Sequence, residues 1–184
     1  TESAVSAGDL GTDANITEHG VFYRQATNGN PPEVWRWDPT TKLREVVASP
    51  PPNMGTVSVE ASSNRLWWSV GELAQNGPGF AKVELYTAPL PLVGPLPTAG
   101  TFVADLSVKL GDDEASDSFY AYHDNDLENG QTIRVLEPGG TETTIPIPPE
   151  ANGVLGLDFV GNDGQVPKSI WFYAGNGMFR LSLP

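Results

Sequence analysis

The chain has 184 residues, enough to bury one sizeable core, and its 20 glycines and 17 prolines favour short strands and turns over long helices. A formal net charge of -13 disfavours nucleic acid and anionic membrane surfaces as partners, because like charges repel. The sequence contains no long apolar run of the kind that inserts into a membrane. Cysteine is absent, which excludes disulfides, thiolate metal sites and cysteine nucleophiles.

The N-terminal part of the chain contains a strand-length segment, SAVSAGDL at residues 3–10, ahead of a first repeated unit. That unit opens at Gly11 with GTDANITEHGVFYR, and the Gly-Thr opening returns 44 residues later in GTVSVEASSNRLWW. Three more strands are predicted after the inner one: VFYRQ (21–25), EVWRWDP (33–39) and KLREVVAS (42–49).

The remaining units repeat this order of an inner strand, an aromatic strand, a third strand and an outer strand. The second unit is predicted to contain TVSVEA (56–61), RLWWSV (65–70), KVELYTAPL (82–90) and, less clearly, APLPLVG (88–94). The third contains TFVADLSV (101–108), SFYAYH (118–123), QTIRVLE (131–137) and TETTIPI (141–147), and the acidic run GDDEASD (111–117) between its first two strands is expected to be a solvated turn. The fourth contains VLGLDFV (154–160), SIWFYAG (169–175) and GMFRLSL (177–183), and lacks an outer strand.

Asn-Gly pairs, which favour hairpin turns, mark all four units at intervals of 48, 53 and 47 residues, beginning at Asn28. Four strands in each unit of about 45 to 50 residues resemble the blades of the β-propeller superfamily. The predicted fold is therefore all-β, a four-bladed β-propeller closed by the N-terminal strand. The predicted blades are approximately 11–52, 53–97, 98–149, and 150–184 with 1–10. The alternatives are half of a larger or dimeric propeller, and a β-sandwich with coincidental spacing.

Two segments resemble particular propeller families. TDANITEHGVFYR is similar to the opening of blades in hemopexin-type domains, which are four-bladed, and this resemblance implies a general binding role. EVWRWDPTTKLREVV resembles blades of bacterial extracytoplasmic propellers of the lactonase and phosphatase type. Together with the acidic composition, these resemblances predict a secreted or periplasmic protein.

Candidate ligands of a cation follow from the glycines that precede the inner strands. Counting from those glycines places Glu60, Asp105 and Asp158 at matching heights along the predicted axial channel, while the first blade has Ile16 there. Clustered carboxylates repel unless a cation lies between them, and oxygen donors suit Ca²⁺. Asp13 and Asn15 stand where the other inner strands carry mainly apolar residues, so they are candidate ligand-binding residues.

A second, weaker candidate is the loop segment YHDNDLENG, in which Asp124, Asp126 and Glu128 alternate as Ca²⁺ ligands do in loops. His123 would add a ligand for a transition metal, or it is a solvated loop residue. The five tryptophans are expected to pack between blades.

No catalytic motif is present, and the two histidines lie in different units. The sequence therefore favours a non-enzymatic extracytoplasmic binding module, monomeric or homodimeric. A cation is expected in its channel. A protein or small ligand is expected on the face where two kinds of loop emerge: the B–C loops, between the second and third strands of a blade, and the D–A loops, between an outer strand and the next inner strand. The alternatives are a small Ca²⁺-dependent hydrolase or lactonase that uses the channel carboxylates, and a lectin.

Overall fold

The computed structural model describes residues 14–27, 29–75, 79–126, 130–148, 151, 154, 156–160, 166–175 and 177–183. Asp13 and Glu128, two of the predicted site residues, and the proposed closing strand at 3–10 lie outside these ranges. No helix long and apolar enough to cross a membrane occurs among the described residues.

The described chain folds into four antiparallel sheets, each built from strands that are consecutive in the sequence. The first sheet contains β1 (Asn15–Thr17), β2 (Gly20–Gln25), β3 (Glu33–Trp37) and β4 (Arg44–Ala48). The second contains β5 (Met54–Ala61), β6 (Arg65–Leu73), β7 (Phe80–Pro89) and β8 (Thr101–Leu106). The third contains β9 (Leu110–Ala115), β10 (Tyr120–Asp124), β11 (Thr132–Leu136) and β12 (Glu142–Pro146), and the fourth contains β13 (Gly156–Val160), β14 (Ser169–Ala174) and β15 (Gly177–Ser182).

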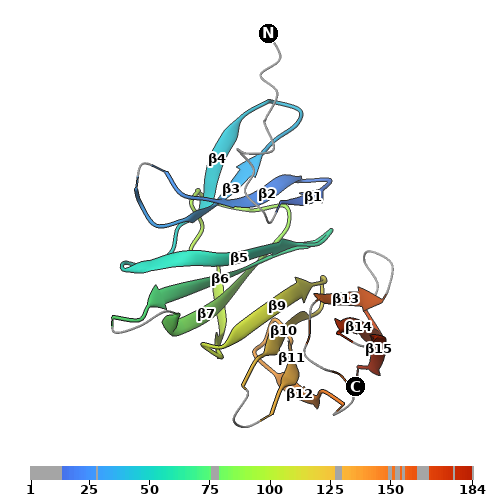
Figure 1. The fold of residues 1–184 in the computed structure, drawn as a ribbon. Helices are drawn as coiled ribbons and strands as arrows, with labels where there is room; N and C mark the ends of the chain where they lie inside the picture. The colour runs from blue at the N-terminus through green and yellow to red at the C-terminus, as the bar shows by residue number, and fades with distance from the viewer. Residues whose placement is uncertain are drawn as a thin grey trace.

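The sheets follow one another in chain order as a fan (Figure 1). Their first strands are neighbours, since β1 contacts β5, β5 contacts β9 and β9 contacts β13. This is the arrangement of propeller blades around an axis, and it confirms the all-β, propeller-like prediction. Closure into a four-bladed ring stays a prediction, because the closing segment lies outside the described residues.

The boundary between the second and third blades differs from the prediction. Residues 101–106, expected to be the inner strand of the third blade, form β8, the outer strand of the second, and pair with β7. Residues 88 and 89 of the segment predicted for that outer place, 88–94, end β7, and the rest lies in an irregular connection with cis peptide bonds before Pro91 and Pro97. Proline lacks the N–H that a sheet ladder requires, so the outer strand can begin only after this segment.

The inner strand of the third blade is β9, which is the acidic run that was predicted to be a solvated turn. Its sequence LGDDEA pairs with β10 in antiparallel register, with an irregularity between Tyr122 and Asp124. An inner strand of a propeller borders the axis, where polar side chains are tolerated. High charge therefore did not prevent strand formation here.

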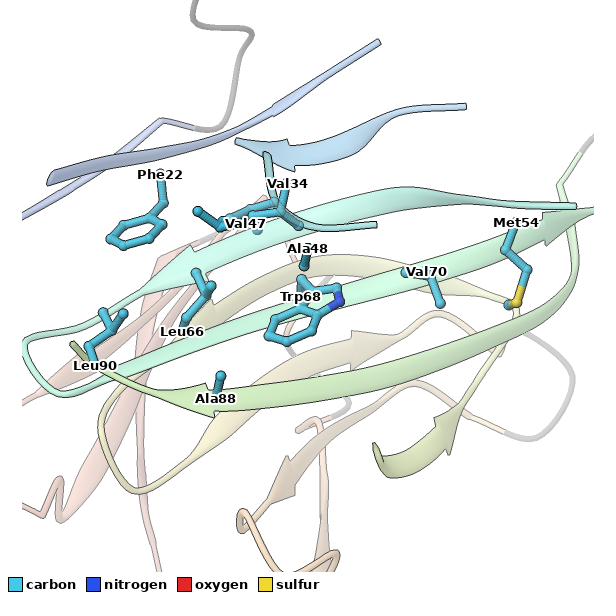
Figure 2. Packing of buried hydrophobic residues seen from close by; sticks show 11 residues of the cluster. Phe22, Val34, Val47, Ala48, Met54, Leu66, Trp68, Val70, Ala88 and Leu90 are labelled. Atoms are coloured by element: carbon cyan, nitrogen blue, oxygen red, sulfur yellow. The ribbon is translucent and has the colours of Figure 1, made fainter. Parts of the chain in front are cut away.

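Apolar side chains fill the space between consecutive blades and form three clusters. Figure 2 shows the first cluster, in which Phe22 and Val34 of the first sheet lie over Leu66 and Trp68 of the second. Trp67, next to Trp68 in β6, belongs to the cluster on the opposite face, with Tyr120 and Tyr122 of the third sheet. Both tryptophans are almost wholly buried, as expected for adjacent residues in a strand covered on both faces.

Polar contacts join the second and third blades at the end where the inner strands finish. The carboxylate of Asp117 accepts hydrogen bonds from the Ser62 hydroxyl at 2.6 Å and from the backbone and side-chain nitrogens of Asn64 at 2.8 and 2.7 Å. The Arg65 Nε donates to the Asp117 carbonyl oxygen at 2.7 Å. Asp117, the last residue of the acidic run, therefore holds the third blade against the second.

Candidate active site at the propeller axis

The strand registers define one equivalent position on each of the four inner strands. Directly opposed residues of antiparallel strands point to the same face of a sheet. In each blade, the inner-strand residue opposite the corresponding residue of the second strand therefore lies at an equivalent height. The four opposed pairs are Asn15 with Phe22, Glu60 with Trp67, Glu114 with Ala121, and Asp158 with Trp171. All four inner-strand residues are polar, and three are acidic.

The structure brings two of the three predicted channel residues to this position and places the third on an outer strand. Glu60 and Asp158 occupy the equivalent position, but Asp105 does not, because it lies on β8 opposite Glu84. The Asp105 side chain is 66% exposed and lies 3.7 Å from the Lys82 Nζ. Its place at the axis is taken by Glu114, and the first blade contributes Asn15, which had been predicted to bind a ligand.

A sequence signal for this set exists in the spacing between the first two strands. In the first three blades the inner polar residue precedes its partner in the second strand by seven residues: 15 to 22, 60 to 67 and 114 to 121. The fourth blade has a longer connection, from Asp158 to Trp171. Counting backwards from the aromatic strand would have found Glu114, whereas counting forwards from a glycine found Asp105.

The environment of Glu114 perturbs its carboxyl group. Burial raises its pKa to about 7, and the negative charges of Asp158, Asp113 and Asp112 add to the increase, against a hydrogen bond from the Ala115 N–H that lowers the pKa. A carboxyl group with this pKa is populated in both protonation states near neutral pH. Such a group is suited to accept and return a proton.

The two aspartates that precede Glu114 accept hydrogen bonds from two different strands. Asp112 Oδ2 accepts a hydrogen bond from the Leu157 backbone nitrogen at 2.7 Å, which joins β9 to β13. Asp113 accepts a hydrogen bond from the hydroxyl of the fully buried Tyr120. Burial, with the nearby charge of Asp113, raises the Tyr120 pKa well above its usual value, so this hydroxyl stays protonated.

The Tyr120 hydroxyl also connects the site to the second blade. It lies 3.3 Å from Ser58 Oγ, which is 2.8 Å from Ser69 Oγ. These buried hydroxyls form a chain that ends on Asp113, and every link has a partner on a different strand. The network fixes the orientation of the acidic strand relative to its neighbour.

The loop residues predicted to bind a cation are held by basic side chains instead. Asp124 is buried at the end of β10, and its Oδ2 accepts a hydrogen bond from Arg134 Nε at 2.9 Å. Asp126 lies 2.7 Å from the Lys109 Nζ. His123 is buried rather than solvated, and burial lowers its pKa.

The donor types at the axis are suited to a hard cation such as Ca²⁺. Within the described part of the chain, no group of three or more histidine or acidic side chains is placed to hold a metal ion. No chemical step through a metal is therefore derived from these residues.

Two cavities open near the inner strands. The larger, about 800 Å³, lies between the first two blades on the face where their B–C and D–A loops emerge, and Arg24, Thr56 and Phe80 are among its lining residues. The smaller, about 410 Å³, lies on the fourth blade and is bordered by Asp158 and Trp171.

Comparison with known proteins supports the fold. No protein-family model matches the chain, and no curated protein sequence matches it. A solved structure described as oligogalacturonate lyase in complex with manganese matches with a TM-score of 0.58 and 16% identity over 92% of this chain and 49% of that chain. That protein is a seven-bladed propeller, so this chain has a β-propeller type of fold and spans about half the length of the solved protein.

The comparison also corrects the functional prediction. The matching propeller is described as a lyase, and this finding contradicts the prediction of a non-enzymatic binding module.

Proposed function

We propose that this chain belongs to a propeller enzyme of the lyase or lactonase-like hydrolase type, with Glu114 as its proton-transfer group. The observation that carries the proposal is the position of Glu114 on an inner strand with a pKa of about 7. The likeness of the fold to an oligogalacturonate lyase supports the reaction class.

Both reaction types need a base. Elimination from a uronate takes the proton on the carbon that bears the carboxylate, forms a carbon–carbon double bond and breaks the carbon–oxygen bond one carbon further on. The departing oxygen then receives a proton. Hydrolysis of a lactone needs a base that accepts a proton from the attacking water. Ionised Glu114 can serve either reaction, and its protonated form can return the proton.

Charge sets a requirement on the substrate. A uronate approaching a chain with a net charge of -13 is repelled unless positive charge lies between them. A divalent cation, Ca²⁺ as predicted or Mn²⁺ as in the matching structure, would neutralise this repulsion when bound.

The size of the ring is a further part of the proposal. A chain that spans half of a seven-bladed propeller is better described as part of a larger ring than as a closed four-bladed one. Light scattering coupled to size-exclusion chromatography tests this, because two paired half-rings have twice the mass of the chain. A monomer destabilised by deletion of residues 1–10 would instead support closure by the N-terminal strand. The extracytoplasmic location and a ligand on the loop face are retained as proposals.

The proposed function is tested with purified protein and two substrate classes. Ultraviolet absorbance follows the unsaturated product of oligogalacturonate elimination, and acid release follows lactone hydrolysis, each with Ca²⁺, with Mn²⁺ and with a chelator. We expect activity to rise through about pH 7 as Glu114 ionises, and to fall at least a hundredfold in Glu114→Gln. Glu137→Gln, which changes an exposed glutamate in a hairpin of the third blade, is the matched control.

Activity that is unchanged in Glu114→Gln, or that lacks an apparent pKa near 7, would contradict the role of Glu114. A protein inactive on both substrate classes under every metal condition would contradict the reaction class. Binding of neutral sugars without turnover would favour the lectin alternative.

A further inference from the structure

The cavity between the first two blades is bounded by the loops that precede β3 and β5 and by the ends of β6 and β7. Its volume of about 800 Å³ lies in the range of small-molecule sites. Met54, which lies at one end of the apolar cluster in Figure 2, forms part of its wall. The cavity therefore rests on a packed core and not on loops alone.

Two glycines allow the apolar wall of this cavity to form. A Cβ atom on Gly71 would lie 2.6 Å from the Phe80 ring, and one on Gly55 would lie 3.0 Å from Pro32 Cδ. The Thr56 backbone nitrogen donates a hydrogen bond to the Pro32 carbonyl oxygen at 2.8 Å, which holds the loop against β5. The rings of Phe80, Pro31 and Pro32 thus form an apolar surface suited to the face of a ring-shaped ligand.

Polar groups in the same lining are suited to a charged ligand with hydroxyl groups. Thr56 is 3% exposed, and its Oγ1 has no hydrogen-bond partner among the residues that the structure describes. A buried hydroxyl in this state is destabilising, and a ligand group in the cavity would provide its partner. The guanidinium of Arg24 lines the cavity too, with Nη1 donating to the Val57 carbonyl oxygen, and guanidinium groups pair well with carboxylates. Glu72 and Gln75 add groups that accept hydrogen bonds from hydroxyls.

We propose that this cavity binds a uronic acid, with its carboxylate at Arg24, one hydroxyl at Thr56 and its ring against Phe80. The choice of a sugar acid rests on the proposed function, while the existence of the site rests on the cavity. The site is separate from Glu114, which lies on β9 in the third blade. It holds an acidic sugar beside the axis and has no part in proton transfer.

The test is a binding experiment that does not depend on turnover. Ligand-observed NMR titration of the whole chain with galacturonate, and with galactose as the neutral counterpart, measures the contribution of the carboxylate. We expect galacturonate to bind at least tenfold more tightly. Arg24→Gln should remove this preference, and Thr56→Val should weaken galacturonate binding several-fold.

Thermal unfolding of each variant keeps the result interpretable. Thr56→Val removes a hydroxyl without a partner, so its melting temperature should equal or exceed that of the wild type while its affinity falls. Equal binding of the two sugars, no binding of either, or an affinity unchanged by both substitutions would overturn the proposal. This titration measures binding, whereas the Glu114→Gln assay measures turnover, so failure of this site and failure of the proposed function are distinguishable.

Discussion

Replacing Glu114 by glutamine should change how the stability of the protein depends on pH. Glutamine has nearly the same shape and carries no charge, so the variant removes the ionisation without opening a cavity. In the folded state the Glu114 pKa is about 7, raised mainly by burial, against an ordinary value of 4.5. The folded protein therefore holds this proton more tightly than the unfolded chain does.

The sign follows from proton binding. Below pH 4.5 both states carry the proton, and the stabilisation that comes from keeping Glu114 neutral is fully present. As the pH rises through 7, folded Glu114 must ionise and this stabilisation is lost. With these two pKa values, the wild type loses about 2.5 kcal/mol of unfolding free energy between pH 5 and pH 8 from this group alone.

Urea denaturation of wild type and Glu114→Gln at pH 5 and pH 8 measures this difference. The variant should gain about 2.5 kcal/mol relative to the wild type on going from pH 5 to pH 8. Glu137→Gln, in which the replaced glutamate is exposed, should keep the pH dependence of the wild type. Parallel curves for wild type and Glu114→Gln would refute the assignment of a raised pKa to this residue.

Two further substitutions test the packing within the second blade and its contacts with the third by thermal unfolding. Gly100→Ala should lower the unfolding free energy by more than about 2 kcal/mol, because its Cβ would lie 2.1 Å from the Trp68 ring. The control is Gly29→Ala, which is also at positive φ but has no neighbour within 4 Å, so it should lower the unfolding free energy less. Equal losses would show that backbone strain alone is responsible. Burial works to raise the Asp117 pKa, but hydrogen bonds from the neighbouring blade, including those from Asn64, and a nearby positive charge lower it overall. Asp117→Asn should therefore lower the melting temperature at pH 7. The difference in melting temperature between wild type and variant should disappear below pH 3.8, as the carboxyl of the folded protein becomes protonated. A difference that persists there would contradict an electrostatic origin.

The repeat of strands was readable from the sequence because it depends on local properties. Aromatic runs such as Trp67–Trp68 mark the second strand of a blade, and a strand with apolar side chains on both faces is covered on both sides. The burial of both tryptophans confirms this interpretation. Two of the three predicted channel acids, Glu60 and Asp158, also occupy the expected position, because each lies on a correctly predicted inner strand.

The third blade was misplaced because inner and outer strands resemble each other locally. Residues 101–106 follow a glycine and alternate as an inner strand does, while residues 110–115 are as polar as a turn. Pairing with β7 makes the first segment an outer strand, and this pairing spans the proline-rich connection that begins after Pro89. A local pattern carries no information about which distant strand is the neighbour.

The sequence alone determined the all-β class and the repeat of antiparallel strand units. The tertiary structure decided which carboxyl groups meet at the axis, and it replaced Asp105 with Glu114. It also decided their chemistry, because the raised pKa of Glu114 comes from burial and from charges on two different blades. Desolvation and Coulomb interactions depend on distances through space, and only folding brings Asp158 close to Glu114.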